Sequence, residues 1–97
     1  MILGLDISTS ITGVTVLDQG NIVCCEAWDF RKYKTFFEKA THARKVMSDL
    51  KKRFPAIEKI FIEQSLQAFR PGFSSAKTIL TLAKFNGTLS WMIYLIR

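Results

Sequence analysis

The sequence predicts an α/β fold: a three-stranded antiparallel meander, a helix, a strand parallel to the meander and a second helix. Two patterns predict it. Short apolar runs separated by turn residues fill residues 1–30 and return at residues 57–63, whereas residues 36–54 repeat apolar side chains at steps of three and four. The 97 residues, of which 48% are hydrophobic, suit a single domain or part of one.

Residues 1–30 predict three strands joined by short turns. The first strand covers residues 2–8 and leads into a serine- and threonine-rich turn. The second covers residues 13–17, and the third runs from residue 22 to about residue 28. Between these two, Gly20 and Asn21 can take positive φ angles in a hairpin loop. The shortest connections then make all three strands antiparallel neighbours.

A helix is predicted over residues 36–54, where apolar residues form one stripe. Pro55 ends this helix, and residues 57–63 return as a strand. Because a strand–helix–strand crossover brings the second strand back in the same direction, we expect residues 57–63 to lie parallel to a strand of the meander.

Residues 67–73 predict a loop, and Ser74 or Ser75 can cap a final helix that ends near Ile96. After Lys84 this helix is apolar on nearly every side, so more than one of its faces should be covered. Either a second copy packs there, or the native polypeptide continues beyond residue 97. The interface of such a homodimer would contain Phe85, Leu89, Met92, Ile93 and Ile96.

The net charge of +6 is unevenly distributed. Residues 1–30 carry four acids and no Lys or Arg, whereas residues 31–97 carry all fourteen basic side chains and four acids. A basic segment of this kind suits an anionic polymer such as nucleic acid. An ordinary solvated basic face explains the composition equally well.

The adjacent Cys24 and Cys25 lack the spacing of a zinc or redox motif, and we expect reduced thiols. The N-terminus has no basic region before its apolar run, and the apolar stretch from Phe85 to Ile96 is too short to span a bilayer. We therefore expect a cytoplasmic protein with no membrane partner.

Asp6 and Glu63 each lie in an apolar, strand-like run. Burying an unpaired carboxylate is costly, so a cation is expected to compensate each charge. If the sheet brings the two acids together, they form a plausible site for a divalent metal ion. The alternative is that Asp6 caps a turn and Glu63 pairs with a neighbouring lysine.

The motifs around these acids resemble those of RuvC-type Holliday-junction resolvases, which have a ribonuclease H-like fold. Ile2-Leu3-Gly4-Leu5-Asp6 followed by Thr12-Gly13-Val14 is similar to the opening of that family. Ile62-Glu63-Gln64 is similar to its second motif, and Ser75-Ala76 to its next helix start. The resemblance spans nearly all of the chain but only the N-terminal part of the family domain, truncated before the fifth strand.

The resemblance implies a magnesium- or manganese-dependent endonuclease that cuts branched DNA, with two metal ions in the complete site. Asp6 would contact both ions and Glu63 one of them. The family works as homodimers, and a nucleoid-associated location or a viral origin would fit it. Phe69 would stack on an unpaired base, Arg70 would bind phosphate, and Lys77 and Lys84 would follow the DNA backbone.

The chain departs from the family pattern at two points. Ile7-Ser8 stands where Pro-Gly is common, and nothing corresponds to the acids of the family's C-terminal helix. We interpret Asp18, Glu26, Asp29 and Glu38 as turn or surface residues, and His42 as a surface residue. The chain alone should therefore hold an incomplete, inactive site.

Two other functions remain open. A catalytically inactive resolvase-like module would bind branched DNA or a protein and would account for the missing acids. An actin-like ATPase or sugar kinase would use Asp6-Ile7-Ser8-Thr9-Ser10 as a phosphate loop, but such proteins need a second domain.

Overall fold

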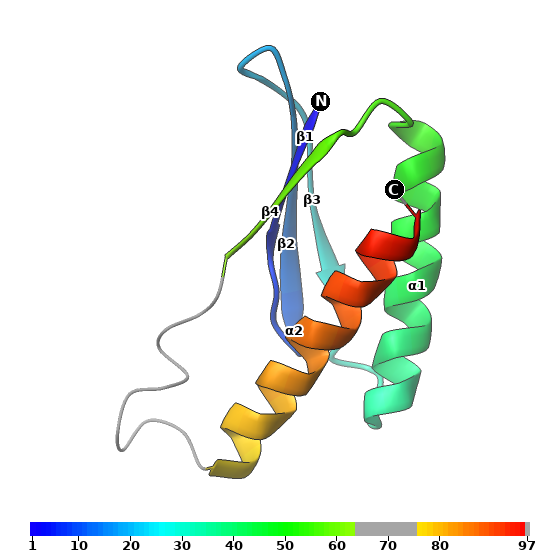
Figure 1. Ribbon diagram of the computed structural model, residues 1–97. Coiled ribbons are helices and arrows are strands. Elements are labelled where there is room, and N and C mark those ends of the chain that lie inside the picture. Colours follow the sequence, from blue (N-terminus) through cyan, green and yellow to red (C-terminus); the bar gives the residue numbers. More distant parts are fainter. Residues whose placement is uncertain (64–75, 97) are drawn as a thin grey trace.

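The protein is described here by a computed structural model, which covers residues 1–63 and 76–96, with side chains up to residue 63 and from residue 80. The chain forms three strands, a helix, a fourth strand and a second helix, in that order (Figure 1). They are β1 (Ile2–Asp6), β2 (Ile11–Asp18), β3 (Asn21–Asp29), α1 (Phe36–Arg53), β4 (Lys59–Glu63) and α2 (Ala76–Ile96).

The four strands form one mixed sheet in the order β3-β2-β1-β4. β1 and β2 are antiparallel, as are β2 and β3, whereas β4 lies parallel to β1. This topology confirms the predicted α/β class, the meander and the parallel return. A ribonuclease H-like arrangement is compatible with it.

The strand boundaries differ from the prediction in both directions: β1 and β4 are shorter than predicted, whereas β2 is longer. β1 ends at Asp6, since the Thr12 hydroxyl donates to the Ser8 carbonyl at 3.0 Å and accepts from the Ser8 amide at 3.2 Å. In the β2–β3 hairpin the positive φ angles belong to Gln19 (51°) and Gly20 (82°). Asn21 already pairs with Asp18, so its predicted turn role is wrong.

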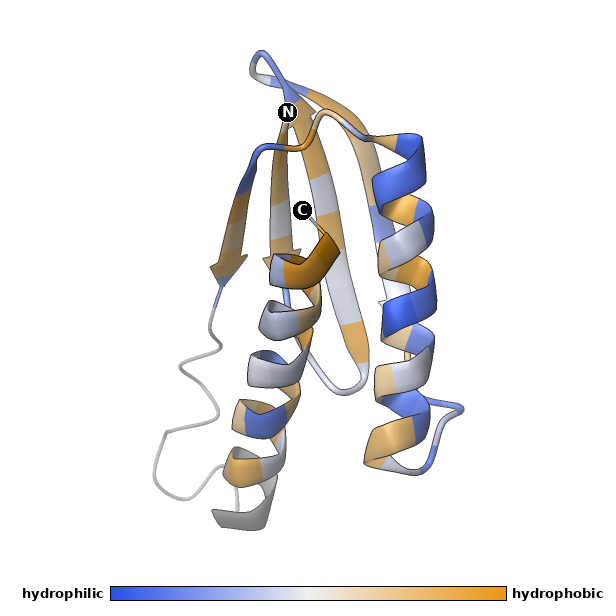
Figure 2. Ribbon diagram, turned by 45° about the vertical axis from the view of Figure 1, so that its right-hand side comes forward, coloured by the Kyte–Doolittle hydropathy of each residue, from blue (hydrophilic) through white to orange (hydrophobic). Residues whose placement is uncertain are grey.

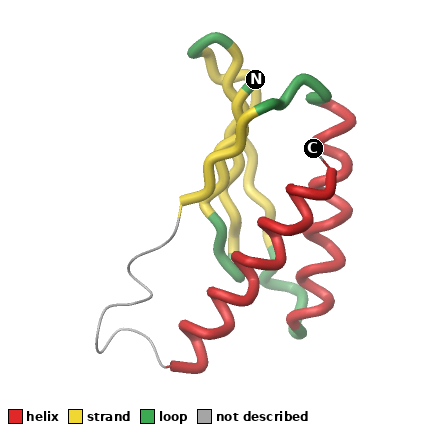
Figure 3. Tube along the Cα trace, viewed as in Figure 1, coloured by secondary structure: helices red, strands yellow, loops and turns green. Residues whose placement is uncertain are grey.

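Both helices lie on one side of the sheet, which gives two layers (Figures 2 and 3). Alternate residues of β1 and β2 point toward the helices, and α1 and α2 each contribute one stripe to the same core. The buried hydrophobic side chains of the sheet and helices include Leu3, Leu5, Val14, Val16, Ala43, Met47, Leu50, Phe85, Leu89 and Ile93. Within the described residues, no element covers the other side of the sheet.

The N-terminus of α1 carries a reciprocal cap. The hydroxyl oxygen of Thr35 accepts a hydrogen bond from the Glu38 amide at 3.1 Å and lies 3.1 Å from the Glu38 carboxylate. Three basic residues close the last turn, where they oppose the negative end of the helix dipole. The predicted stripe and the stop before Pro55 are confirmed, since the helix ends at Arg53.

The dimer interface predicted on the last helix is corrected by the burial of its residues. Phe85, Leu89 and Ile93 are 0%, 0% and 4% exposed inside the core of this chain, and Met92 and Ile96 pack against that core. Phe85, Leu89 and Ile93 are therefore not free to contact a second copy, whereas Met92 and Ile96 keep part of their surface exposed. The opposite side of α2 is apolar as well, with exposed side chains at Leu80, Trp91, Tyr94 and Leu95.

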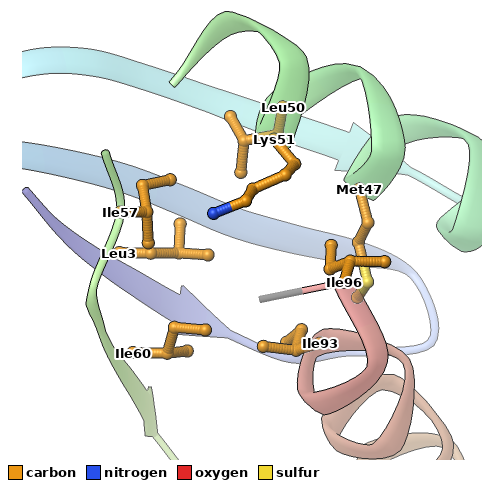
Figure 4. A pocket seen from close by; sticks show the side chains of 8 residues that line it. All are labelled: Leu3, Met47, Leu50, Lys51, Ile57, Ile60, Ile93 and Ile96. Carbon is orange, nitrogen blue, oxygen red and sulfur yellow. The ribbon is translucent and has the colours of Figure 1, made fainter. Parts of the chain in front are cut away.

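Where α1, α2, β1 and β4 meet, apolar side chains surround a hollow of about 20 Å³ (Figure 4). The Lys51 ammonium lies beside it and donates to the Pro55 carbonyl at 3.1 Å. So small and apolar a space is a packing defect of the core and leaves no room for a ligand. Of the described helices, neither has the length and apolar character needed to cross a membrane.

Candidate metal centre

Asp6 and Glu63 are directly paired in the sheet. Each is the last residue of its strand, and the parallel register of β1 and β4 places Asp6 opposite Glu63. Neighbouring strands lie about 4.8 Å apart, and paired residues of parallel strands point to the same face. The fold therefore brings the two predicted metal ligands side by side.

The side chains of Asp6 and Glu63 are exposed and not buried. The sequence-based expectation that a cation must compensate the cost of burying them is therefore wrong. Along β1, Leu3 and Leu5 point into the core, and Asp6 follows one residue later on the uncovered face. Along β4, Ile62 packs against the core and Glu63 is exposed. Both carboxylates are solvated, so a metal ion is permitted here but is not required for folding.

Neither carboxylate has a hydrogen-bond or ion-pair partner among the side chains and backbone groups that the structure describes. The two alternative roles are thus not observed. The turn after Asp6 is capped by the Ser8 hydroxyl oxygen, which accepts from the Ser10 amide at 3.2 Å. The oxygens of Asp6 and Glu63 remain available to a ligand.

Small residues adjoin Asp6 on the uncovered face. Gly13 of β2 pairs with Asp6, and a Cβ atom at position 13 would lie 3.7 Å from the Cβ of Asp6. Gly4 stands two residues before Asp6 on the same face and pairs with Phe61. The lack of side chains at both glycines leaves space for an ion and its water ligands.

The loop that follows Asp6 is fixed by three elements. Besides the bonds between Ser8 and Thr12, the Lys39 ammonium of α1 donates to the Thr9 carbonyl at 2.6 Å. The Phe30 amide donates to the Ser10 carbonyl at 2.7 Å. Sequence patterns gave no signal for Lys39, because its partners are backbone groups far away in the chain.

Two carboxylates are a hard-oxygen donor set suited to Mg²⁺ or Mn²⁺, which keep several water ligands. Within the described ranges, no group of three metal-binding side chains occurs. Asp6 and Glu63 therefore fit one hydrated divalent ion. Two ions would require ligands beyond this pair.

Glu26, Asp29 and His42 have structural partners. Glu26 accepts from Arg53 at 2.8 Å and from the Trp28 indole at 3.0 Å, and the Arg53 hydrogen bond is the main cause of the lowered pKa of Glu26. Asp29 pairs with Arg31 at 2.7 Å. His42 is half-buried, and its Nδ1 atom lies 3.1 Å from the Tyr33 hydroxyl. His42 is therefore only partly the surface residue that the sequence predicted.

The structure describes only some of the residues that were predicted to contact nucleic acid. Phe69 and Arg70 lie outside the described residues, and Lys77 is described only as backbone of α2. Lys84 is exposed, with its ammonium 4.8 Å from the centre of the Phe36 ring. Lys84 therefore contributes a cation–π contact between the helices, and the structure does not bring it to the two acids.

Comparison of the chain with protein-family models, with curated proteins and with solved structures found no match.

Proposed function

We propose that the chain carries part of the metal site of a phosphodiesterase that acts on branched DNA, in the manner of RuvC-type resolvases. The observation that supports this most is the register of β1 with β4, which pairs Asp6 and Glu63. Two carboxylates at the ends of adjacent parallel strands, with no partner among the described residues, are an arrangement that can hold a divalent ion. The family motifs at the same two residues support the same chemistry.

A bound Mg²⁺ or Mn²⁺ ion would activate water and stabilise the negative charge of the departing oxygen. The contribution of Asp6 and Glu63 is to hold the ion at the uncovered face of the sheet. The fixed loop after Asp6 keeps the first ligand in place, because Lys39 and Thr12 bond its backbone. Organised ligands of this kind bind a metal with less loss of conformational entropy.

A non-cutting DNA- or protein-binding module is the second candidate. It is favoured by the number of ligands, since the described residues offer two carboxylates and no group of three. On either proposal, the 97-residue chain should bind a metal weakly and should not cleave DNA by itself. A magnesium-dependent nick in branched DNA by this chain would contradict that expectation.

The actin-like ATPase or sugar kinase has less support. A phosphate loop binds its ligand through free backbone amides. Here the Ser8 amide donates to the Thr12 hydroxyl and the Ser10 amide donates to the Ser8 hydroxyl. Nucleotide protection in a thermal shift assay, without protection by branched DNA, would favour the kinase.

The metal assignment is tested by titrating Mn²⁺ into the protein and measuring binding by calorimetry. We expect saturable binding to the wild-type chain and its loss in both Asp6→Asn and Glu63→Gln. Asp18→Asn, at the far end of β2, is the matched control and should bind as the wild type does. Undiminished binding by either site variant would exclude the proposed pair.

The nuclease assignment is tested in a protein that holds the complete site. Asp6→Asn and Glu63→Gln should each abolish cleavage of a four-way junction and leave junction binding nearly intact, because they change the reaction site and not the basic surface. Normal cutting by either variant would rule out the metal-dependent mechanism. Junction binding without cutting by the wild type would support the binding module.

A further inference from the structure

The positive charge of the chain is concentrated in one segment. Residues 31–53 contain nine basic and two acidic side chains, whereas the remaining 74 residues contain five basic and six acidic ones. The segment forms the connection after β3 and the whole of α1. The electrostatic attraction for an anionic partner is therefore strongest at α1, in the layer of the molecule opposite to the face that holds Asp6 and Glu63.

The fold directs these charges outward. α1 buries a stripe of small and apolar residues against the sheet and α2, while Arg44, Lys45 and Lys52 are exposed. Figure 2 shows the hydrophilic segments that alternate with this stripe along the helix. Arg31 and Arg53 pair with Asp29 and Glu26, and the remaining exposed basic side chains of the segment still outnumber its two acids.

Next to these cations, aromatic side chains line an open hollow of about 490 Å³, the Tyr33 pocket. Its lining residues are Tyr33, Phe37, Glu38, Thr41, His42 and Lys45. Phe37 is 75% exposed, and its ring lies edge-on to that of Phe36 with the ring centres 5.4 Å apart. Most of the Phe37 ring is therefore accessible to a ligand in the pocket.

The aromatic wall of the pocket is held in place by its own contacts. The rings of Tyr33 and His42 lie 4.8 Å apart with an interplanar angle of 32°, and the Tyr33 hydroxyl lies 3.1 Å from His42 Nδ1. The Lys32 ammonium is 5.2 Å from the centre of the Tyr33 ring. Burial lowers the pKa of His42, and the nearby charges of Lys32 and Lys45 lower it further.

We propose that the Tyr33 pocket binds single-stranded nucleic acid, with a base against Tyr33 and Phe37 and the neighbouring phosphates at Lys32 and Lys45. Aromatic rings beside a basic groove bind unpaired bases by stacking, whereas in a duplex the faces of the bases are covered by their neighbours. The site uses none of the residues of the metal centre, so it stands whether or not Asp6 and Glu63 bind a metal.

The test measures the fluorescence anisotropy of a labelled 12-nucleotide oligothymidylate titrated with the full chain. We expect Phe37→Ala to weaken binding at least about fivefold, the lower end of the effect of losing one stacking ring. Lys45→Ala should weaken binding and reduce the slope of log K against log salt by about 0.7, the value for one phosphate contact on a single strand. Phe61→Ala, which removes a ring that is 63% exposed on the uncovered sheet face, is the control and should leave oligothymidylate binding unchanged.

Four results would overturn the proposal. The first is wild-type affinity in Phe37→Ala after near-ultraviolet circular dichroism has shown a native fold. The second is equal competition by heparin and by unlabelled oligothymidylate at matched charge, which would mean that bases contribute nothing. The third is a tighter complex with a 12-base-pair duplex than with the single strand. Loss of oligothymidylate binding in Asp6→Asn, with Phe37→Ala unaffected, would place the contact at the metal centre and also refute the pocket.

Discussion

The ammonium of Lys39 lies 2.6 Å from the carbonyl oxygen of Thr9, so a side chain of α1 holds the loop that directly follows Asp6. The same ammonium lies 3.1 Å from the carbonyl oxygen of Phe30, where β3 leads into the connection before α1. One half-buried charge thus joins two loops to the helix layer at the end of the sheet where the candidate metal centre lies.

Replacing Lys39 by methionine keeps the length of the side chain and removes both hydrogen bonds. Because charge-assisted bonds to partly buried carbonyls are lost, we expect the free energy of unfolding to fall by about 1–3 kcal/mol. Urea denaturation followed by tryptophan fluorescence measures this change. Lys34→Met, at an exposed lysine outside the hydrogen bonds described above, is the control, and an equal loss in both variants would refute the role of Lys39.

Asp6 and Glu63 place two negative charges side by side, and no cation of the described residues pairs with either one. In the presence of a chelator, Asp6→Asn or Glu63→Gln should raise the free energy of unfolding by about 0.5–1 kcal/mol, because like charges on paired residues repel. Added Mg²⁺ should raise the melting temperature of the wild type and leave both variants unchanged, since a ligand that binds only the folded state stabilises it. A melting temperature of the wild type that is insensitive to Mg²⁺ would contradict the metal site.

The Glu26 carboxylate accepts two hydrogen bonds from Arg53, and this partner lowers the pKa of Glu26 below its ordinary value of 4.5. A lowered folded-state pKa stabilises the protein above the unfolded pKa, and the contribution is lost as the pH falls through the folded value. Glu26→Gln should therefore cost up to about 1 kcal/mol at pH 7 and less at pH 3. Unfolding curves at the two pH values test this, and a constant difference would show that the charge is irrelevant.

The two sides of α2 should respond differently to truncation. Phe85→Ala removes a fully buried ring and should cost about 3–5 kcal/mol, which in a domain of this size can abolish folding, so Phe85→Leu provides a milder variant. Trp91→Ala removes a side chain that is 61% exposed and should change stability by less than about 0.5 kcal/mol. Thermal denaturation of each variant measures these losses of stability. A loss in Trp91→Ala as large as in Phe85→Leu would mean that the exposed side of α2 is covered in solution.

Much of the fold could be predicted because its signals are local. The apolar stripe of residues 36–54 and the proline after it define α1, and the apolar runs with their turns define the strands. The crossover also predicted that the strand after α1 runs parallel to a strand of the meander, and the structure shows that this strand is β1, which pairs Asp6 with Glu63.

Other features could not be predicted because they depend on contacts between distant elements. α2 is apolar on two opposite sides, so its sequence does not tell Phe85, which is buried, from Trp91, which is exposed. Glu26 and Arg53 are 27 residues apart and meet only when α1 packs beside β3. The bond from Lys39 to Thr9 has the same origin.

The sequence alone indicated an acid on the first strand, an acid at the end of the fourth strand, and a fourth strand parallel to a strand of the meander. Only the tertiary structure decided on which face of the sheet the acids lie. Successive side chains of a strand alternate between the two faces, and both helices pack on the face of Leu3 and Leu5. Asp6 and Glu63 therefore point to the uncovered face, where water solvates them and a divalent ion can reach them.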